Sequence, residues 1–162
     1  MECYEGIQVI KTFRGLIADA AQDTIVLHTN DGSTGYRIVK FKLFPKQPGH
    51  TVNYESVVQI FSTDQLAAGG TIPASGATVD FTNQELLAAA YYQDNNNDAY
   101  PSSLDVVFDK MVFNQDIYVT HTDNASGGFI NYYIELEQIK LDMGENTVAT
   151  LKDIRNIKTQ GF

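Results

Sequence analysis

The chain contains 162 residues, 43% of them hydrophobic and 19% charged, a balance that excludes a disordered tail and a coiled coil. Twenty acidic and eleven basic side chains give a net charge of -9, which argues against nucleic acid and acidic lipid surfaces as partners. Cys3 is the single cysteine, so neither an intrachain disulfide nor a thiolate metal cluster can form. A chain of this length can bury one sizeable core, and we expect a single domain over residues 1–162.

The first residues, Met1–Gly6, carry neither the basic n-region nor the apolar h-region of a signal peptide. We therefore expect no export signal and interpret residues 1–6 as an N-terminal arm. No apolar run approaches the length of about 18 residues that indicates a membrane-spanning helix. These features predict a protein that is assembled in the cytoplasm and does not cross a membrane.

Short blocks rich in β-branched and aromatic residues alternate with a period of two, which is typical of strands. Between them lie turn sequences such as Asn30–Ser33, whose Asn, Asp and Gly tolerate positive φ, and Asp123–Gly128, which we expect to close a hairpin. The predicted strands, with a weaker one at Ala77–Phe81, are Ile7–Phe13, Thr24–Thr29, Tyr36–Phe44, Tyr54–Phe61, Leu104–Asp109, Gln115–Thr122 and Phe129–Leu141.

Two of these strands show which side chains should face the core. In the third predicted strand, Lys40 and Lys42 lie on a wet face opposite an apolar one. In the last, Glu135 and Glu137 lie on the wet face, and the length of the strand predicts a bulge or bend within it. The predicted core-facing residues of the two strands are Val39, Phe41, Leu43, Ile130, Tyr132, Ile134 and Leu136.

Two helices are predicted from the spacing of capping-box residues. A short connecting helix spans Thr82–Tyr92, which begins Thr-Asn-Gln-Glu and continues with two leucines and a run of alanines. A C-terminal helix covers residues 145–158, where Val148, Leu151 and Ile154 fall on one stripe. The whole pattern predicts an all-β protein: a two-sheet antiparallel β-sandwich of jelly-roll type with one short connecting helix and a C-terminal helix.

Candidate catalytic and metal-binding residues are few. His28, His50 and His121 are scattered, without a second ligand at the spacing of a metal site, and we interpret them as structural histidines. Glu135 and Glu137 lie roughly 6.5–7 Å apart along a strand, a separation also found in glycosidases, but the chain has no Trp to frame a sugar. We predict no enzyme activity, no cofactor and no catalytic or metal-binding residue, with a hydrolase site assembled from distant residues left as an alternative.

Two loops interrupt the strands. Asp94–Asp98 begins like a calcium loop, but position six is Ala99 instead of Gly, and Asp105 stands where Glu would provide two oxygens. A solvated turn within Asp94–Pro101 is the better interpretation. The second loop, Leu66–Gly76, contains two adjacent glycines and one proline, and we expect it to be a mobile excursion.

The nine tyrosines and nine phenylalanines are more informative about function. Tyr132 and Tyr133 must point to opposite faces of a strand, so one ring can fill the core while the other stays outside. An exposed tyrosine tolerates water and gains from burial, which suits contact with another protein. Together with the low charge content, this predicts a protein whose main role is contact.

The C-terminal third contains Phe113–His121, Asn131–Glu137 and Thr147–Arg155, and Leu27–Arg37 lies earlier in the chain. These segments, which cover under a third of the chain, resemble small virion structural proteins of marine tailed bacteriophages. No catalytic motif accompanies the resemblance, so no functional residue is carried over from it. The resemblance implies a place in a virion that assembles in the host cytoplasm.

The expected function is therefore that of a non-enzymatic capsid decoration or cement protein, which reinforces contacts between shell subunits. Its expected partners are the major capsid protein or other virion proteins, together with further copies of itself in a homo-oligomer. A collar or tail position is one alternative. Another is a carbohydrate-binding module, in which Tyr91, Tyr92 and Tyr100 around the asparagine-rich loop would stack on sugar rings.

Overall fold

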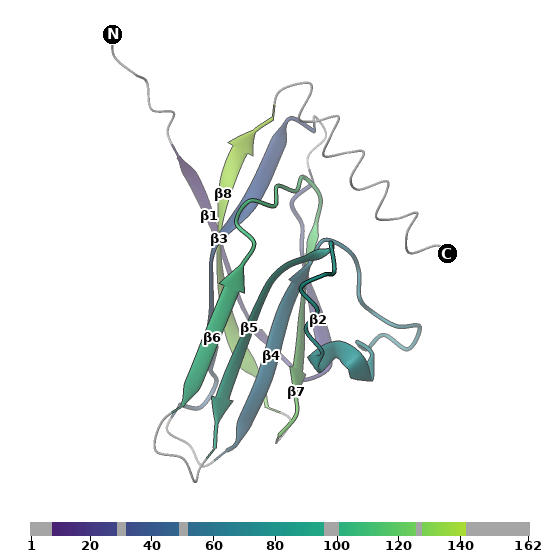
Figure 1. The fold of residues 1–162 in the computed structure, drawn as a ribbon, viewed down its shortest axis with the longest axis vertical. Coiled ribbons are helices and arrows are strands. Elements are labelled where there is room, and N and C mark those ends of the chain that lie inside the picture. Colours follow the sequence, from purple (N-terminus) through teal and green to yellow (C-terminus); the bar gives the residue numbers. More distant parts are fainter. Residues whose placement is uncertain (1–7, 29–31, 49–51, 96–100, 126–127, 142–162) are drawn as a thin grey trace.

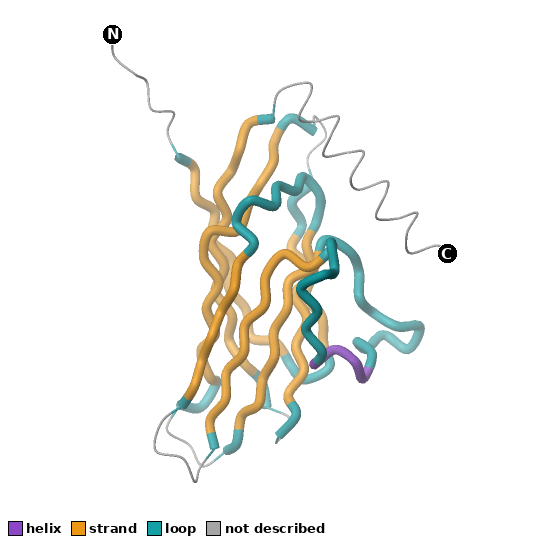
Figure 2. The backbone as a smooth tube through the Cα atoms, viewed as in Figure 1, coloured by secondary structure: helices purple, strands orange, loops and turns teal. Residues whose placement is uncertain are grey.

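A computed structural model describes residues 8–28, 32–48, 52–95, 101–125 and 128–141. Within these ranges the chain is almost entirely strand and loop, with one short 3₁₀ helix, η1 (Figure 2). The predicted N-terminal arm over residues 1–6 and C-terminal helix over 145–158 lie outside them. The elements are β1 (Val9–Ile17), β2 (Ala21–Ile25), β3 (Thr34–Pro45), β4 (Tyr54–Phe61), η1 (Ala74–Ala77), β5 (Leu86–Asp94), β6 (Ser102–Val107), β7 (Ile117–Asp123) and β8 (Ile130–Lys140).

The described strands form two antiparallel sheets that lie face to face (Figure 1). A three-stranded sheet has the order β1-β8-β3, and a five-stranded sheet has the order β2-β7-β4-β5-β6. Strands far apart in the sequence become neighbours, because β1 pairs with β8 along its whole length. The prediction of an all-β protein with two antiparallel sheets is confirmed.

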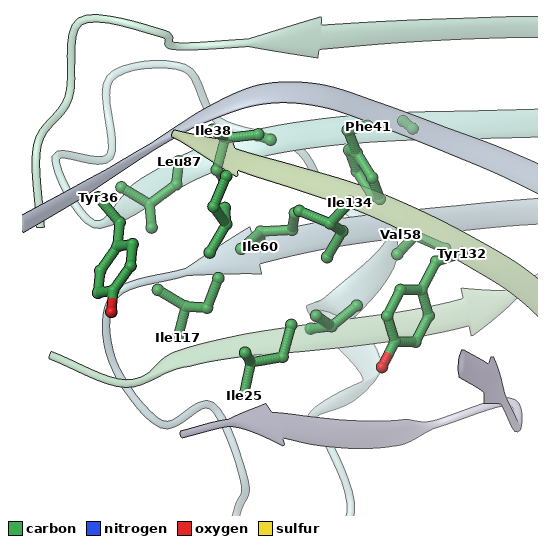
Figure 3. Close-up of a cluster of buried hydrophobic side chains, with 14 of the residues drawn as sticks. Ile25, Tyr36, Ile38, Phe41, Val58, Ile60, Leu87, Ile117, Tyr132 and Ile134 are labelled. Carbon is green, nitrogen blue, oxygen red and sulfur yellow. The ribbon is translucent and has the colours of Figure 1, made fainter. Parts of the chain in front are cut away.

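Apolar side chains from both sheets fill the space between them (Figure 3). Every second residue of a strand faces the same side, and the predicted inner face of β8, from Ile130 to Leu136, is buried. It packs with residues of the facing sheet such as Ile60 on β4 and Ile117 on β7. Burial of this shared apolar surface is the main force that holds the two sheets together.

The predicted irregularity of the long C-terminal strand lies in its partner, β3. The register between β3 and β8 shifts between Ile38 and Lys40. Val39 is the extra residue of this bulge, and it therefore leaves the alternation that was predicted to place it beside Phe41 and Leu43. Those two residues do face the core, as expected.

The connecting helix predicted over Thr82–Tyr92 is wrong, because Leu86–Asp94 forms β5. All five residues of Leu86–Ala90 are buried, and a strand buried on both faces gives the same continuous apolar run as a buried helix. The residues before it form turns instead of a capping box. The backbone N–H of Glu85 donates to Asn83 Oδ1 at 2.9 Å, an Asx turn that competes with helix initiation.

Other boundaries also differ from the prediction. β4 has the predicted ends, whereas β1 and β2 are both displaced from Ile7–Phe13 and Thr24–Thr29. The corner between them contains Ala20 at φ 57°, and neither Gly nor Pro marks this turn in the sequence. The weak strand predicted at Ala77–Phe81 is absent, since its first residue ends η1 and the rest is not strand.

The chain between β4 and β5, residues 62–85, lies over the outer face of the five-stranded sheet, and we name it the covering segment (Figure 1). It includes the predicted excursion Leu66–Gly76. Ile72 is buried, and its N–H donates to the carbonyl of Ala20 at 3.3 Å. Gln59 on β4 donates from Nε2 to the carbonyl oxygens of Gly76 at 2.9 Å and Thr78 at 3.3 Å. The segment is thus tied to the sheet by an apolar anchor and by polar bonds.

Candidate functional site

His121 has a structural environment. It is fully buried on β7, and its Nδ1 donates to the carbonyl of Ala18 at 3.0 Å. Nε2 is therefore free of a proton in the neutral ring and accepts from the Ser56 hydroxyl at 3.0 Å. Burial lowers the pKa of His121, which keeps the ring neutral. The ring ties β7 to β4 and to the β1–β2 corner.

His28 is exposed and joins a loop to the start of β7. Asp116 Oδ1 accepts from the Leu27 N–H at 2.8 Å, the His28 N–H at 3.1 Å and His28 Nδ1 at 2.7 Å. Burial raises the pKa of Asp116, but these hydrogen bonds outweigh it, and the net shift is downward. His50 lies outside the described residues. In the described ranges, no three His, Cys, Asp or Glu side chains come together as a metal site would require.

Glu135 and Glu137 project from the outer face of β8, as predicted. Glu137 pairs with Arg37 on β3, and Glu135 Oε1 accepts from the Tyr133 hydroxyl at 3.0 Å. These partners account for both carboxylates as members of an ordinary solvated sheet face. Asp94 ends β5, and residues 96–98 of the calcium-like loop Asp94–Asp98 lie outside the described residues.

The two tyrosine pairs behave as strand geometry requires. Tyr132 is buried and donates to Asp23 Oδ2 at 2.9 Å, while Tyr133 lies on the outer face. Tyr92 packs edge-on against Tyr54 with ring centroids 5.8 Å apart, whereas Tyr91 points to the opposite side of β5. Tyr91 and Tyr92 therefore cannot form one stacking platform, and Tyr100 lies outside the described residues.

A groove lies on the outer face of the three-stranded sheet, with a volume of about 620 Å³. Cross-strand pairing places Leu16 of β1, Asn131 of β8 and Phe44 of β3 in one row. Leu16 is 45% and Phe44 61% exposed. The shorter Asn131 between them forms the floor. We name this the outer-face groove, and its lining residues are Arg14, Gly15, Leu16, Lys42, Leu43, Phe44, Asn131, Tyr132 and Tyr133.

The row next to it adds two cations around an aromatic ring. Arg14 and Lys42 flank Tyr133 from the two neighbouring strands. Lys42 Nζ also donates to Asp105 Oδ2 on β6 at 2.6 Å. Among the described lining residues there is no carboxylate and no nucleophile–base pair, so the groove offers apolar, aromatic and donor contacts instead of reactive groups. This combination of side chains is typical of a protein contact surface.

The sequence could not reveal the outer-face groove, because its residues come from three strands that are not consecutive in the sequence, β1, β3 and β8. Alternation along each strand indicated that Lys42 and Tyr133 lie on wet faces. The pairing order β1-β8-β3, which places Tyr133 between Arg14 and Lys42, is a property of the topology.

The outer face of the five-stranded sheet carries a smaller exposed apolar patch. Tyr91 and Leu104 are cross-strand neighbours on β5 and β6, and they are 41% and 59% exposed. The covering segment occupies the region around Gln59 on the same side of this sheet. No helix of the described ranges has the length and apolar character needed to cross a membrane.

A functional assignment for this chain rests on the fold and on these surfaces. No protein-family model matches the chain, and no curated protein sequence matches it.

Proposed function

We propose that the chain is a non-enzymatic virion structural protein, a capsid decoration protein that reinforces contacts between shell subunits. The observation that carries the proposal is the outer-face groove, where Leu16 and Phe44 remain exposed beside Tyr133 and Arg14. Aromatic and arginine side chains are enriched where proteins meet. The resemblance of Phe113–His121 and Asn131–Glu137 to phage virion proteins points the same way.

The strand order supports a jelly roll as the finer description of the fold. Eight-stranded jelly rolls pair the first strand with the last, the second with the seventh and the fourth with the fifth. The pairs β1–β8, β2–β7 and β4–β5 follow this scheme, and β6 departs from it by pairing with β5 instead of β3. Viral capsid domains are among those that use this fold.

A decoration protein works through apolar area buried at subunit seams. Each square ångström of apolar surface removed from water stabilises a contact by about 25 cal/mol before the costs of association. A symmetric shell repeats the contact many times, so weak individual contacts add up through avidity. In this proposal, the major capsid protein or another virion protein covers the outer-face groove.

The test uses phage particles that lack the protein, prepared by deleting its gene. These particles are expected to rupture at a lower temperature than intact ones, and addition of the purified protein should restore the rupture temperature. The variant Phe44→Glu should fail to restore it. Leu104→Glu, at a similarly exposed position on the other sheet, is the matched control and should restore it. A wild-type protein that neither binds particles nor changes their rupture temperature would refute the proposal.

Labelled protein on the same particles distinguishes the decorated shell from the collar or tail. Label spread over the head is expected for a decoration protein. Label confined to the portal vertex or tail would retain the virion assignment and reject the shell role.

Carbohydrate binding is a second candidate, favoured by the composition of the outer-face groove. The Tyr133 ring could stack on a sugar, while Asn131 and Arg14 beside it could donate to its hydroxyl groups. A glycan array with the purified chain should then show saturable binding that Tyr133→Ala removes. Absence of saturable binding would eliminate this candidate.

A further inference from the structure

The four edge strands of the described sheets differ in how their free sides are protected. Unpaired backbone groups at a sheet edge can pair with another chain unless something blocks them. On β3, Tyr36 exchanges two backbone hydrogen bonds with Phe113, at 2.7 and 2.9 Å. On β2, which has five residues, the Gln22 side chain binds Asp64 at 2.9 Å and the Gln65 N–H at 2.8 Å. The β3 edge is thus paired with another part of the chain at Tyr36, and the β2 edge is covered by the start of the covering segment.

β1 is different. It is nine residues long, contains no proline and is rich in β-favouring residues. Within the described ranges, its pairing is with β8 alone, and no other backbone group donates to or accepts from it. β6, the remaining edge strand, has six residues and is tied to β3 through the Lys42–Asp105 ion pair. Within these ranges, β1 is therefore a nine-residue edge strand with no backbone partner on its free side.

The sequence of β1 is complementary to itself in an antiparallel arrangement. Suppose that two copies meet with Phe13 on a two-fold axis perpendicular to the sheet. Each residue of one copy then lies opposite a residue of the other copy, and the two residue numbers add up to 26. Ile10 then lies opposite Leu16 of the second copy, and both side chains are exposed on the outer face, at 41% and 45%. Lys11 lies opposite Gly15, and Thr12 lies opposite Arg14. No like charges stand directly opposite each other, although the two Arg14 side chains are diagonal neighbours across the axis. Two apolar cross-strand pairs form, one on each side of the axis.

Neighbouring registers that also keep the outer faces of both copies on the same side of the joined sheet form less favourable cross-strand pairs. With Arg14 on the axis, two guanidinium groups stand directly opposite each other. With Lys11 on the axis, two ammonium groups do so. With Thr12 on the axis, Ile10 faces Arg14 and the Ile10–Leu16 pair is lost. Like charges directly opposite each other destabilise a strand pair, whereas apolar pairs stabilise it. Charge repulsion therefore disfavours two of these registers, and loss of the Ile10–Leu16 pair disfavours the third.

We propose that β1 pairs with β1 of a second copy of this chain in the Phe13-centred antiparallel register. The two three-stranded sheets then form one continuous sheet with the order β3-β8-β1-β1-β8-β3. Such a contact is isologous and closed, because the same edge is used on both sides of a two-fold axis. The axis places both outer-face grooves on the same side of the joined sheet. The inference does not depend on the proposed virion function, because it rests on the edge of β1.

Sedimentation equilibrium of the full chain tests the proposal. A dimer is expected, and a chain that remains monomeric up to about 100 μM would overturn the proposal. Thr12→Arg places two arginines opposite each other on each side of the axis, and should weaken the dimer roughly 2- to 30-fold. Within one chain the new arginine lies beside Glu135, so folding should be retained. Circular dichroism checks this.

The double variant Thr12→Arg/Arg14→Glu restores opposite charges across the axis and should restore the dimer. Ser102→Arg adds the same charge at an exposed position of β6 and serves as the matched control, with no expected effect. If Ser102→Arg weakens the dimer while Thr12→Arg does not, the proposal is wrong.

A cross-linking experiment tests the register without relying on charge. In a Cys3→Ser background, Ile10→Cys and Leu16→Cys proteins are oxidised separately and as a mixture. The register predicts a disulfide-linked dimer in the mixture and not in either protein alone, since only unlike positions face each other. Equal cross-linking within each separate protein, or none in the mixture, would refute the register.

Discussion

The outer faces of the two sheets differ in how far the described chain covers them. The covering segment lies over the five-stranded sheet, where it buries Gln59 and inserts Ile72. No described segment lies over the outer-face groove of the three-stranded sheet, where Leu16 and Phe44 remain exposed. A protein that needed apolar burial only for its own stability gains from covering both faces. Within the described residues, the chain itself thus covers part of one outer face and leaves the outer-face groove exposed, where we propose that a partner binds.

Ile72→Ala should produce the largest effect on this comparison. Removing a buried isoleucine side chain from the covering segment should lower the free energy of unfolding by about 2–4 kcal/mol, through lost burial and a cavity. Phe44→Ala, on the uncovered face, should change it by no more than about 0.5 kcal/mol. Urea unfolding of both variants checks the contrast. Equal losses would show that the two faces contribute alike to stability.

Gln59→Leu should lower the free energy of unfolding by about 1–3 kcal/mol. The variant cannot donate to the carbonyls of Gly76 and Thr78, which bind the Gln59 amide over the sheet. Faster amide exchange confined to the covering segment should accompany the loss. Unchanged exchange there would show that the polar bonds do not hold the segment in place.

Lowering the pH should lower the free energy of unfolding, because His121 is buried in the folded chain. Burial lowers the pKa of this histidine in the folded chain, whereas an unfolded histidine has a pKa of about 6.5. Between the two values the unfolded chain carries more protons, so stability is full above pH 6.5 and falls below it, by at most about 1.4 kcal/mol per pH unit. Unfolding at about pH 7.5 and 5.5 measures this change.

His121→Gln should remove most of that dependence. The pKa values of Asp64, Asp80 and Asp116 are also lowered in the folded chain. In the unfolded chain these carboxylates titrate below about pH 5, so they do not cause a change in stability between about pH 7.5 and 5.5. A wild-type protein whose stability is constant between about pH 7.5 and 5.5 would contradict the role assigned to His121.

Ala20→Gly should have the smallest effect, a gain of up to about 1 kcal/mol. Ala20 has φ 57°, where glycine avoids the strain of a Cβ atom. The substitution keeps the carbonyl that accepts from Ile72, so the covering segment should stay in place. The midpoint of thermal unfolding measures the gain, and a clear loss would show that the corner needs the alanine methyl group.

The sequence predicted well those strands that have one wet face. The alternation in β8 identified its core residues, because period-two patterns report burial directly. The ends of β4 were also correct. β5 was misread as a helix, since both of its faces are buried and its leucines and alanines also favour helices. The corner at Ala20 lacked a turn signal. Local patterns fail where tertiary contacts determine the conformation.

Prediction of the candidate site was more limited. The sequence indicated that one ring of Tyr132 and Tyr133 is exposed, and strand geometry separated them as expected. It suggested Tyr91 and Tyr92 as joint sugar contacts, which their positions on opposite faces of β5 exclude. The outer-face groove depends on strand pairing between β1, β8 and β3, and alternation within single strands carries no information about pairing.

Imaging the protein in its native assembly by electron cryomicroscopy tests the central claim most directly. The account predicts that a neighbouring subunit covers the outer-face groove and that Phe44 and Tyr133 lie in the contact. The covering segment should face solvent or a minor contact. A reconstruction in which the groove faces bulk solvent, while Tyr91 and Leu104 meet the neighbouring subunit, would contradict the account.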